Sequence, residues 1–429
     1  MTAGILFGFL ALFLFIQVPI GIALGAASIV TIWYSGLVKF NYLAQSLTTA
    51  TDSFPLMAVP FFILAGGLMG EGGISRRLLD TAALLVGRMT GGLGLVTVAA
   101  CMFFAAISGS GPATVAAIGG IMLPAMVREG YDKGFAGGLV ATAGSIGVII
   151  PPSIPMVIFC VAAEKVSISD LFLAGVFPGI LVGVMLMAWA WFISRKKGWK
   201  AKNPKIYTTK EVIAILSDAK WALFVPIIIL GGIYGGVFTP TEAAAVAVIY
   251  GFVVGVFVYK DLTLKQVPSV VIQAGLTTAT VLIIIGTATT FGRMLTLERV
   301  PQALVEAISA FSTNPLVILL LINLLLLVVG CFMETLAAII ILAPILLPVA
   351  MAVGIDPIHF GIIMVVNLAI GFITPPLGVN LFVTCGISKM PLEELAKEIV
   401  PWFFVMLTTL AIIVIFPGLS TWLPAMVRG

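Results

Sequence analysis

The sequence predicts an all-α polytopic membrane protein, and three observations support this fold class. Of the 429 residues, 61% are hydrophobic and only 9% are charged, with a mean hydropathy of +1.22, whereas soluble domains carry about 25% charged residues. Long apolar stretches without charges recur along the chain, at 6–18, 223–237 and 243–258. A proline pair also interrupts an apolar segment twice, at 151–152 and at 375–376, and we call the spacing between the two pairs the repeat offset.

The basic residues are gathered in one segment. Eight of the 22 lysines and arginines lie between Arg195 and Lys220, and the positive-inside rule predicts that 195–220 is a cytoplasmic loop. Because this charge is not spread over a face, the net charge of +4 predicts no nucleic-acid partner. Residues 1–5 include no basic residue, so we expect the first apolar stretch to remain as a helix and not to be a signal peptide.

The two halves on either side of this loop are related in sequence. When 121–152 is aligned with 345–376 without a gap, 11 of 32 positions are identical, and six of these are glycine or proline. The register continues to Lys165 and Lys389. We interpret this as an internal repeat and favour two inverted repeats, a common transporter design. The predicted domains are N-terminal scaffold helices (1–50), repeat 1 (51–194), the basic loop (195–220), further scaffold helices (221–260) and repeat 2 (261–429).

Each repeat contains one helix that its proline pair should break. Proline lacks a backbone N–H and clashes with the preceding turn, so a pair ends a helix. The predicted broken transmembrane helices are 137–164 and 360–388. Lipid cannot satisfy the freed backbone groups, so such a break persists only where it lines a cavity or binds a ligand. Two matching breaks therefore predict the central binding site of a transporter.

Upstream of each break, the sequence predicts a re-entrant hairpin, at 95–124 and at 316–348. Two apolar arms flank the polar tip 108–112 in the first hairpin and 333–335 in the second. A spanning helix needs about 20 residues, so three arms of 12 or 13 residues are too short and one of 17 is marginal. The predicted arms are 95–107, 113–124, 316–332 and 336–348.

The tips and breaks together offer backbone carbonyl and hydroxyl oxygens, which suit an alkali cation. Half-helix C-terminal ends favour cations and N-terminal ends favour anionic groups, so we predict Na⁺ beside a carboxylate-bearing solute. For any one serine or threonine, the alternative is a hydroxyl that bonds to its own helix. The predicted Na⁺ ligands are Ser108, Ser110, Ser145, Gly147, Ser153, Gly330, Gly371, Thr374 and Leu377. Among the residues of repeat 2, Leu377 and the two glycines would bind through their backbone oxygens. The predicted solute contacts are Pro152, Glu334, Thr335, Asn380 and Thr384.

Several of these polar residues have open alternatives. Glu334 lies between two apolar runs, and its carboxylate could hold the hairpin tip by hydrogen bonds, bind a cation or carry a proton. Asn380 and Thr384 are four positions apart on one helix face, where they could contact solute or form interhelical hydrogen bonds. His359 stands alone at an expected segment edge, and we expect it at the surface.

Rival classes lack their characteristic residues. An intramembrane enzyme needs a catalytic set, and this chain has one histidine and no HExxH motif. No arginine occurs in the central motifs to suggest a carboxylate clamp, and Arg293 and Arg299 are expected in a loop. The four cysteines show no CxxC pairing and are interpreted as packing residues. A passive scaffold would have no need of duplicated helix breaks.

Four motifs in order give the chain a family pattern. They are Phe54-Pro-Leu with Pro60-Phe-Phe, Gly147 with Pro151-Pro-Ser-Ile-Pro155, Phe238-Thr-Pro-Thr-Glu242-Ala-Ala, and Gly371 with Thr374-Pro-Pro-Leu-Gly-Val-Asn380. Together they resemble the large membrane subunit, of the DctM or SiaM type, of tripartite ATP-independent periplasmic (TRAP) transporters in the ion transporter superfamily. The resemblance covers essentially the whole chain and indicates the unfused form, whose small subunit is a separate protein.

The resemblance implies sodium-coupled import of a small organic acid, such as sialic acid or a C4-dicarboxylate, across the bacterial inner membrane without ATP. It implies two protein partners in addition to the lipid bilayer: a small four-helix membrane subunit and a periplasmic solute-binding protein. It also implies an elevator-type mechanism, in which a transport domain with two hairpins slides against a scaffold domain. The alternative is a stand-alone sodium- or proton-coupled carrier that needs no binding protein.

The resemblance also implies where sodium binds. The family's sites lie where hairpins meet broken helices, which here means Gly330, Gly371, Thr374 and Leu377, with a pseudo-symmetric site around Ser108, Gly147 and Ser153. The tips depart from the Ser-Asn-Thr pattern often seen in related carboxylate carriers, since they read Ser108-Gly-Ser110 and Met333-Glu-Thr335. The tip ligands are therefore expected to differ from that pattern.

Overall fold

The computed structural model describes residues 2–36, 38–39, 41–163, 166–199, 207–311 and 314–428, without side chains for 307–311 and 428. Every regular element in these ranges is a helix. Nine helices of the described ranges are long and apolar enough to cross a membrane, which confirms the predicted all-helical polytopic membrane protein. Lys165, the predicted repeat partner of Lys389, and 200–206 of the predicted cytoplasmic loop lie outside the described residues.

The first half of the chain contains helices interrupted by short 3-10 and π segments. In order they are α1 (Thr2–Phe15), α2 (Ile20–Ser35), α3 (Asn41–Thr51), η1 (Phe54–Met57), α4 (Ala58–Glu71), α5 (Ile74–Val86), α6 (Gly92–Ser108), α7 (Gly111–Thr114), η2 (Val115–Gly119), α8 (Gly120–Arg128), α9 (Lys133–Gly144), η3 (Ser145–Val148), α10 (Ile154–Ala163) and α11 (Ile168–Lys197).

The second half repeats much of this order. Its elements are α12 (Thr209–Tyr234), α13 (Pro240–Val253), η4 (Val254–Val258), α14 (Val267–Leu297), α15 (Val300–Phe311), α16 (Pro315–Phe332), α17 (Thr335–Ala352), α18 (Pro357–Gly371), α19 (Val379–Ser388), α20 (Leu392–Ile415) and α21 (Gly418–Arg428).

The helix boundaries of the two halves recur at the repeat offset. α7, η2 and α8 form one continuous helical segment, and α17 occupies the corresponding positions of the second half. The starts of α9 and α18 are separated by the same offset, and so are the starts of α11 and α20. The stretch from α3 to α4 corresponds to α14, whose start and end lie within two positions of the same offset. Sequence identity and helix boundaries thus follow one spacing.

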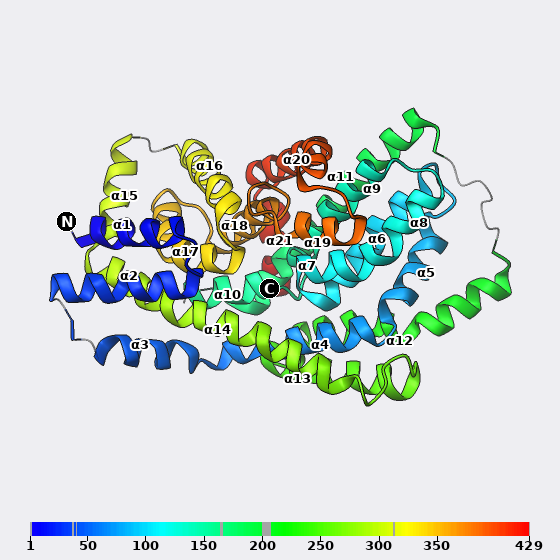
Figure 1. The fold of residues 1–429 in the computed structure, drawn as a ribbon, viewed down its shortest axis with the longest axis horizontal. Helices are drawn as coiled ribbons and strands as arrows, with labels where there is room; N and C mark the ends of the chain where they lie inside the picture. The colour runs from blue at the N-terminus through cyan, green and yellow to red at the C-terminus, as the bar shows by residue number, and fades with distance from the viewer. Residues whose placement is uncertain are drawn as a thin grey trace.

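The helices form two groups that α14 connects. Figure 1 shows α2, α3, α4 and α13 along one side of the molecule, and the hairpins and broken helices on the other. α14 packs against α2, α3 and α4, and it also packs against α17 of the second hairpin. α14 therefore lies between the two groups.

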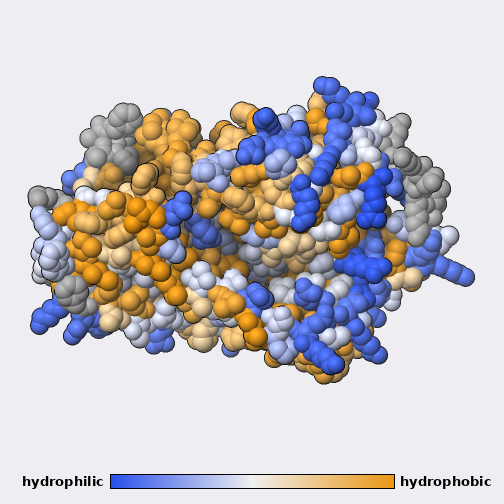
Figure 2. Space-filling view, in the orientation of Figure 1, coloured by the Kyte–Doolittle hydropathy of each residue, from blue (hydrophilic) through white to orange (hydrophobic). Residues whose placement is uncertain are grey.

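The outer surface of the protein is largely apolar. Large side chains such as Phe15, Trp33 and Phe332 are exposed. Figure 2 shows apolar side chains over most of the visible face, with hydrophilic ones concentrated toward the end where α5, α8 and α12 lie. Apolar exposure on this scale is unusual for a soluble monomer, and lipid solvates it without cost.

The hairpin arms are longer than the sequence predicted. α6 has 17 residues, and the second arm of the first hairpin and both arms of the second have 18 each. The prediction ended two of the arms at Pro124 and Pro348, but both prolines lie inside helices. Prolines are tolerated in membrane helices because neighbouring helices and local adjustments satisfy the freed carbonyl. The short-arm argument for re-entrant hairpins was therefore wrong.

The polar segment between the halves is also more helical than expected. α11 extends to Lys197, and α12 begins at Thr209, so both ends of the predicted loop 195–220 belong to helices. Thr208 starts α12 with a capping box, in which its hydroxyl and the Glu211 carboxylate satisfy backbone N–H groups reciprocally. This cap explains why the helix begins before the apolar stretch does.

Candidate functional site

The tip of the first hairpin is organised by its own hydroxyl groups. Ser108 Oγ lies 3.0 Å from Thr114 Oγ1, and Thr114 Oγ1 donates to the Ser110 carbonyl oxygen at 2.8 Å. Ser110 is the N-cap of α7, since its Oγ accepts from the Ala113 N–H at 3.5 Å. Sequence reasoning missed Thr114, although its spacing of four from Ser110 on one helix was a usable signal.

The first broken helix contacts this tip through its backbone. Regular structure ends at Val148 and resumes at Ile154, and Ser153 Oγ donates to the Val148 carbonyl oxygen at 2.6 Å. The Ile154 N–H donates to the Gly109 carbonyl oxygen at 3.3 Å. Gly109 has a φ of 59°, and a Cβ there would lie 2.8 Å from the Pro152 carbonyl oxygen. The loop therefore requires glycine both for conformation and for close approach.

Gly147 completes the first site. A Cβ on Gly147 would lie 2.5 Å from the Ser110 carbonyl oxygen and would also collide with Thr114 Oγ1. The break thus places its backbone directly against the hairpin tip. Neutral carbonyl and hydroxyl oxygens from two elements meet here, and this donor set suits Na⁺. The structure brings together the predicted residues Ser108, Ser110, Gly147, Pro152 and Ser153.

The second hairpin and the second break meet in the same way. Helix α18 ends at Gly371 and α19 begins at Val379. The Leu377 N–H donates to the Cys331 carbonyl oxygen at 3.0 Å. A Cβ on Gly371 would lie 2.5 Å from the Gly330 carbonyl oxygen. The structure therefore brings Gly330, Gly371 and Leu377 together, as predicted, through main-chain groups.

The second site has fewer hydroxyl groups than the first. Thr374 Oγ1 donates to the Ile370 carbonyl oxygen at 2.8 Å, which leaves its lone pairs for a cation. Glu334 Oε2 accepts from the N–H groups of Leu336 and Ala337 at 2.9 and 3.2 Å. Glu334 is thus the N-cap of α17. Of the alternatives that the sequence left open, this is the one in which its carboxylate holds the hairpin tip by hydrogen bonds. Thr335 is the first residue of α17 and is buried.

Asn380 connects the two halves. Its Nδ2 donates to the Ala141 carbonyl oxygen at 2.9 Å and to Ser145 Oγ at 3.2 Å. The side chain is fully buried, and so is that of Ser145. Asn380 therefore forms the interhelical hydrogen bonds that the sequence left as one alternative. These bonds place the start of α19 against the end of α9, beside the first site.

The predicted solute contacts are mostly closed to solvent. Pro152, Asn380 and Thr384 are buried, and so is Thr335. The Thr384 hydroxyl and the Asn380 Oδ1 have no hydrogen-bond partner among the described residues. Glu334 is the one of the five that is partly exposed. Direct contact between solute and the buried four therefore requires a conformation other than this one.

His359 contradicts the expectation of a surface histidine. Its side chain is 2% exposed. Asp356 caps α18 by accepting from the N–H groups of Ile358 and His359 at 2.8 and 3.2 Å. α18 is buried on all sides from His359 onward, so even its first turn lacks a solvent-facing edge. The start of a helical segment in the sequence therefore did not indicate a position at the protein surface.

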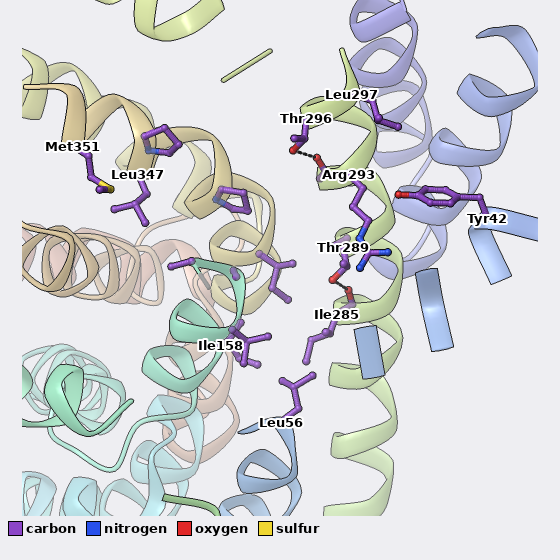
Figure 3. A pocket seen from close by; sticks show the side chains of 18 residues that line it. Tyr42, Leu56, Ile158, Ile285, Thr289, Arg293, Thr296, Leu297, Leu347 and Met351 are labelled. Atoms are coloured by element: carbon purple, nitrogen blue, oxygen red, sulfur yellow. Dashed lines mark hydrogen bonds between the residues drawn. The ribbon is translucent and has the colours of Figure 1, made fainter. Parts of the chain in front are cut away.

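A cavity of about 700 Å³ lies between α14 and the pair α10 and α17. Arg293 lines it from α14, which corrects the expectation that this arginine lies in a loop. The apolar run around Arg293 continues as helix to Leu297, so the charge did not mark a helix end. Figure 3 shows Arg293, Thr289 and Thr296 on α14, across the cavity from Leu347 and Met351.

A helical membrane bundle in which two hairpin tips meet two broken helices is the architecture of a secondary transporter. The chain matches, over residues 7–419, the family described as "Tripartite ATP-independent periplasmic transporter, DctM component". The chain therefore belongs to the DctM family, as the sequence motifs predicted.

Curated relatives carry names of the same kind. The chain is 51% identical over 97% of its length to the "Isethionate TRAP transporter permease protein DctMQ" of Oleidesulfovibrio alaskensis, and it spans 65% of that relative. It is 46% identical to the "C4-dicarboxylate TRAP transporter large permease protein DctM" of Pseudomonas aeruginosa, covering 94% of this chain and 93% of the relative. It is 40% identical to the "Sialic acid TRAP transporter large permease protein SiaM" of Vibrio cholerae, covering 99% of each.

A solved transporter shares the fold. The YdaH transporter of Alcanivorax borkumensis superposes with a TM-score of 0.63, at 16% sequence identity, over 88% of each chain. At this identity the likeness concerns the fold alone.

Proposed function

We propose that this chain is the large permease subunit of a TRAP transporter and imports a small organic acid together with Na⁺. The observation that carries the proposal is the pairing of each hairpin tip with a break. Gly147 lies against Ser110 in the first half, and Gly371 lies against Gly330 in the second. Each pair gathers neutral oxygens without a carboxylate among the predicted Na⁺ ligands, which favours a monovalent cation.

The recurrence of helix boundaries supports an internal repeat, and we propose that the two halves are inverted with respect to each other. Their helix boundaries follow the repeat offset from α3 to α11 and from α14 to α20. Each site combines a tip and a break of one half, and Asn380 of the second half bonds to Ala141 of the first. We propose that the hairpins and broken helices form a transport domain that moves against a scaffold including α2, α13 and α14, as in an elevator.

The solute is proposed to be a small organic acid of the sialic acid or C4-dicarboxylate class. Relatives at 40–51% identity are named for C4-dicarboxylates, sialic acid and isethionate, so a sulfonate joins the two carboxylate classes as a substrate to test. The proposed partners are a small four-helix membrane subunit and a periplasmic solute-binding protein. The proposed location is the bacterial inner membrane.

The competing function is a stand-alone carrier. It would transport solute without a delivery protein, and Glu334 would be its proton- or ion-carrying group. The capping role of Glu334 gives that carboxylate a structural function and so weakens this alternative.

Uptake into proteoliposomes tests the proposal. The chain is reconstituted with its small subunit and supplied with the binding protein carrying radiolabelled acid. We expect uptake that requires an inward Na⁺ gradient and the binding protein. Equal uptake with K⁺ in place of Na⁺ would remove sodium coupling, and uptake of free acid without the binding protein would favour the stand-alone carrier.

Replacing Thr374 with valine is expected to weaken the sodium dependence of uptake. The substitution removes an oxygen whose lone pairs are free, and losing one bond to a charged species costs enough to raise the half-saturating Na⁺ concentration roughly 10-fold. The measurement is the uptake rate against Na⁺ concentration. Thr408→Val is the matched control, because Thr408 Oγ1 makes the same bond to its own helix, to the Phe404 carbonyl at 2.8 Å, on an exposed part of α20. An unchanged sodium curve for Thr374→Val would exclude the residue from the site.

A further inference from the structure

The cavity beside α14 contains a charge that the proposed sodium sites leave unexplained. Arg293 is the one charged residue among the described residues that line the cavity. None of the predicted Na⁺ ligands or solute contacts lines it. A charged side chain within a membrane-spanning helix is costly and usually functional, so the role of this guanidinium calls for an explanation.

Arg293 has few partners inside the protein. Its Nη1 donates to Ser46 Oγ of α3 at 3.4 Å. The ion pairs recorded across the described ranges join Arg77 to Asp218 and to Asp261, and Lys197 to Asp132. A guanidinium has five N–H donors, so most of those of Arg293 remain for water or for a ligand. Its hydrogen bond to Ser46 directs the guanidinium toward α3.

Three polar residues form a stripe on the same side of α14. Thr289, Arg293 and Thr296 follow a spacing of four and then three, which places them on one helix face, and all three line the cavity. Both threonine hydroxyls donate to their own helix, to Ile285 at 2.8 Å and to Gly292 at 3.0 Å. Their lone pairs are therefore available to accept hydrogen bonds from a ligand.

The first half of the chain has no such stripe. The positions that correspond by the repeat offset are Ala65, Met69 and Gly72, and they pack closely against α13 and η4. A Cβ on Gly251 would lie 2.9 Å from Met69 Cγ, and a Cβ on Gly72 would lie 3.0 Å from Gly255 Cα. The fold thus accommodates small and apolar residues at these positions, and the polar stripe of α14 is specific to the cavity.

We infer that this cavity binds the anionic group of the transported acid, with Arg293 as its principal donor. Figure 3 shows Tyr42 with its hydroxyl end turned toward α14 near Arg293, so that a carboxylate or sulfonate can accept from both. Thr289 and Thr296 accept from hydroxyl groups of the solute. Isoleucines and leucines of the lining, such as Ile158, contact its carbon chain. The volume of about 700 Å³ lies within the usual range for small-molecule sites.

The location of the cavity places this site between the two proposed domains. The cavity lies between α14, assigned above to the scaffold, and α10 and α17 of the proposed transport domain. It therefore holds the acid at the boundary of the two domains before or after the sodium sites engage. This inference rests on the proposed function for the identity of the ligand, but the binding itself requires no sodium gradient.

Equilibrium binding tests the inference. The probes are succinate and isethionate, with succinamide as the neutral analogue, and the protein is the full chain with its small subunit in nanodiscs of phosphatidylcholine. We expect Arg293→Met to weaken binding of at least one acid by 10-fold or more, and Arg293→Lys to weaken it less, because lysine keeps the charge but loses the planar fork. Succinamide binding should not distinguish wild type from Arg293→Met.

The control is Arg299→Met, which makes the same change in net charge just beyond α14 and outside the cavity lining. It should bind the acids as wild type does. Equal acid affinity for wild type and Arg293→Met would overturn the inference, as would a wild-type protein that binds neither acid while eluting as a folded complex.

An anionic lipid headgroup offers the same chemistry, and the nanodisc composition separates it from the acid. The measurements are repeated with phosphatidylglycerol in the bilayer. If Arg293→Met no longer binds phosphatidylglycerol but binds the acids with wild-type affinity, the cavity binds a lipid headgroup and the inference is wrong. Because these assays measure binding without a gradient, failure of sodium-driven uptake would count against the proposed function and leave the inference standing.

Discussion

Replacing Gly371 with alanine is expected to reduce sodium-driven uptake by roughly 100-fold or more, because a displacement of about 1 Å at a site can cost that much. The added Cβ would lie 2.5 Å from the Gly330 carbonyl oxygen, 2.8 Å from its carbonyl carbon and 2.9 Å from its Cα. All three are backbone atoms, so no side chain can rotate away to make room. The hairpin tip and the break must separate, and the oxygens that they bring together separate with them.

The measurement is initial uptake with saturating acid, with and without a Na⁺ gradient. Gly386→Ala is the matched control, since Gly386 lies in α19 of the same broken helix and a Cβ there meets nothing within 4 Å. It should transport at the wild-type rate. Size-exclusion elution of the Gly371→Ala complex distinguishes a displaced site from failed folding. Wild-type uptake by a folded Gly371→Ala protein would show that close backbone approach is not required for transport.

The two sites are similar in backbone and different in side chains. In the first, Thr114 and Ser108 supply hydroxyls beside the Ser110 carbonyl, whereas the corresponding positions of the second half are Ala338 and Phe332. In the second proposed site, the candidate ligands are backbone groups and the Thr374 hydroxyl. Removing the hydroxyl of Ser108 or Thr114 should therefore disturb several neighbouring hydrogen bonds of the first site. Removing the hydroxyl of Thr374 should affect the second site through that residue alone.

Local sequence signals predicted the positions of both helix breaks. Proline pairs end helices wherever they occur, so the breaks after Val148 and Gly371 followed from residue chemistry alone. Gly147 and Gly371 are identical positions of the aligned halves, and the structure shows that both approach a hairpin tip closely through their backbone. Family membership followed in part from the same residues, because two of the four motifs contain the breaks.

Single prolines and single charges were less informative. Pro124 and Pro348 lie within helices, because a membrane bundle can satisfy one freed carbonyl but not the disruption of a pair. Arg293 lies in a helix next to a cavity, and nothing in its sequence neighbours distinguishes that position from a helix end. His359 is buried because other helices surround α18. The sequence of α18 alone does not indicate which helices pack around it.

Contacts between distant segments were the least predictable. Asn380 was placed correctly on one face with Thr384, but its partners Ala141 and Ser145 are 239 and 235 positions away. The choice between solute and helix as its partner depends on how the two halves pack. In this conformation, Asn380 bonds to the end of α9 and to Ser145, which is the interhelical alternative.

Replacing Asn380 with aspartate is therefore expected to destabilise the protein and to abolish uptake. The side chain is fully buried, and Nδ2 is the donor to both the Ala141 carbonyl at 2.9 Å and Ser145 Oγ at 3.2 Å. An ionised carboxylate has no donor for that carbonyl, and a buried charge without a partner costs about 3–5 kcal/mol. The expected result is a clear fall in the melting temperature of the purified complex, together with loss of sodium-driven uptake.

The pH dependence of this variant separates the hydrogen bond from simple misfit. A protonated carboxyl is neutral and regains one O–H donor, so the melting temperature of Asn380→Asp should rise toward that of wild type as the buffer becomes more acidic. The control is Asn314→Asp, at the exposed N-cap of α16, where the side-chain oxygen accepts from the Leu316 N–H at 3.0 Å. Aspartate caps helices as well as asparagine does, so this control should melt and transport like wild type. A melting temperature for Asn380→Asp that equals the wild-type value at neutral pH would mean that the contact between α19 and α9 does not hold the two halves together.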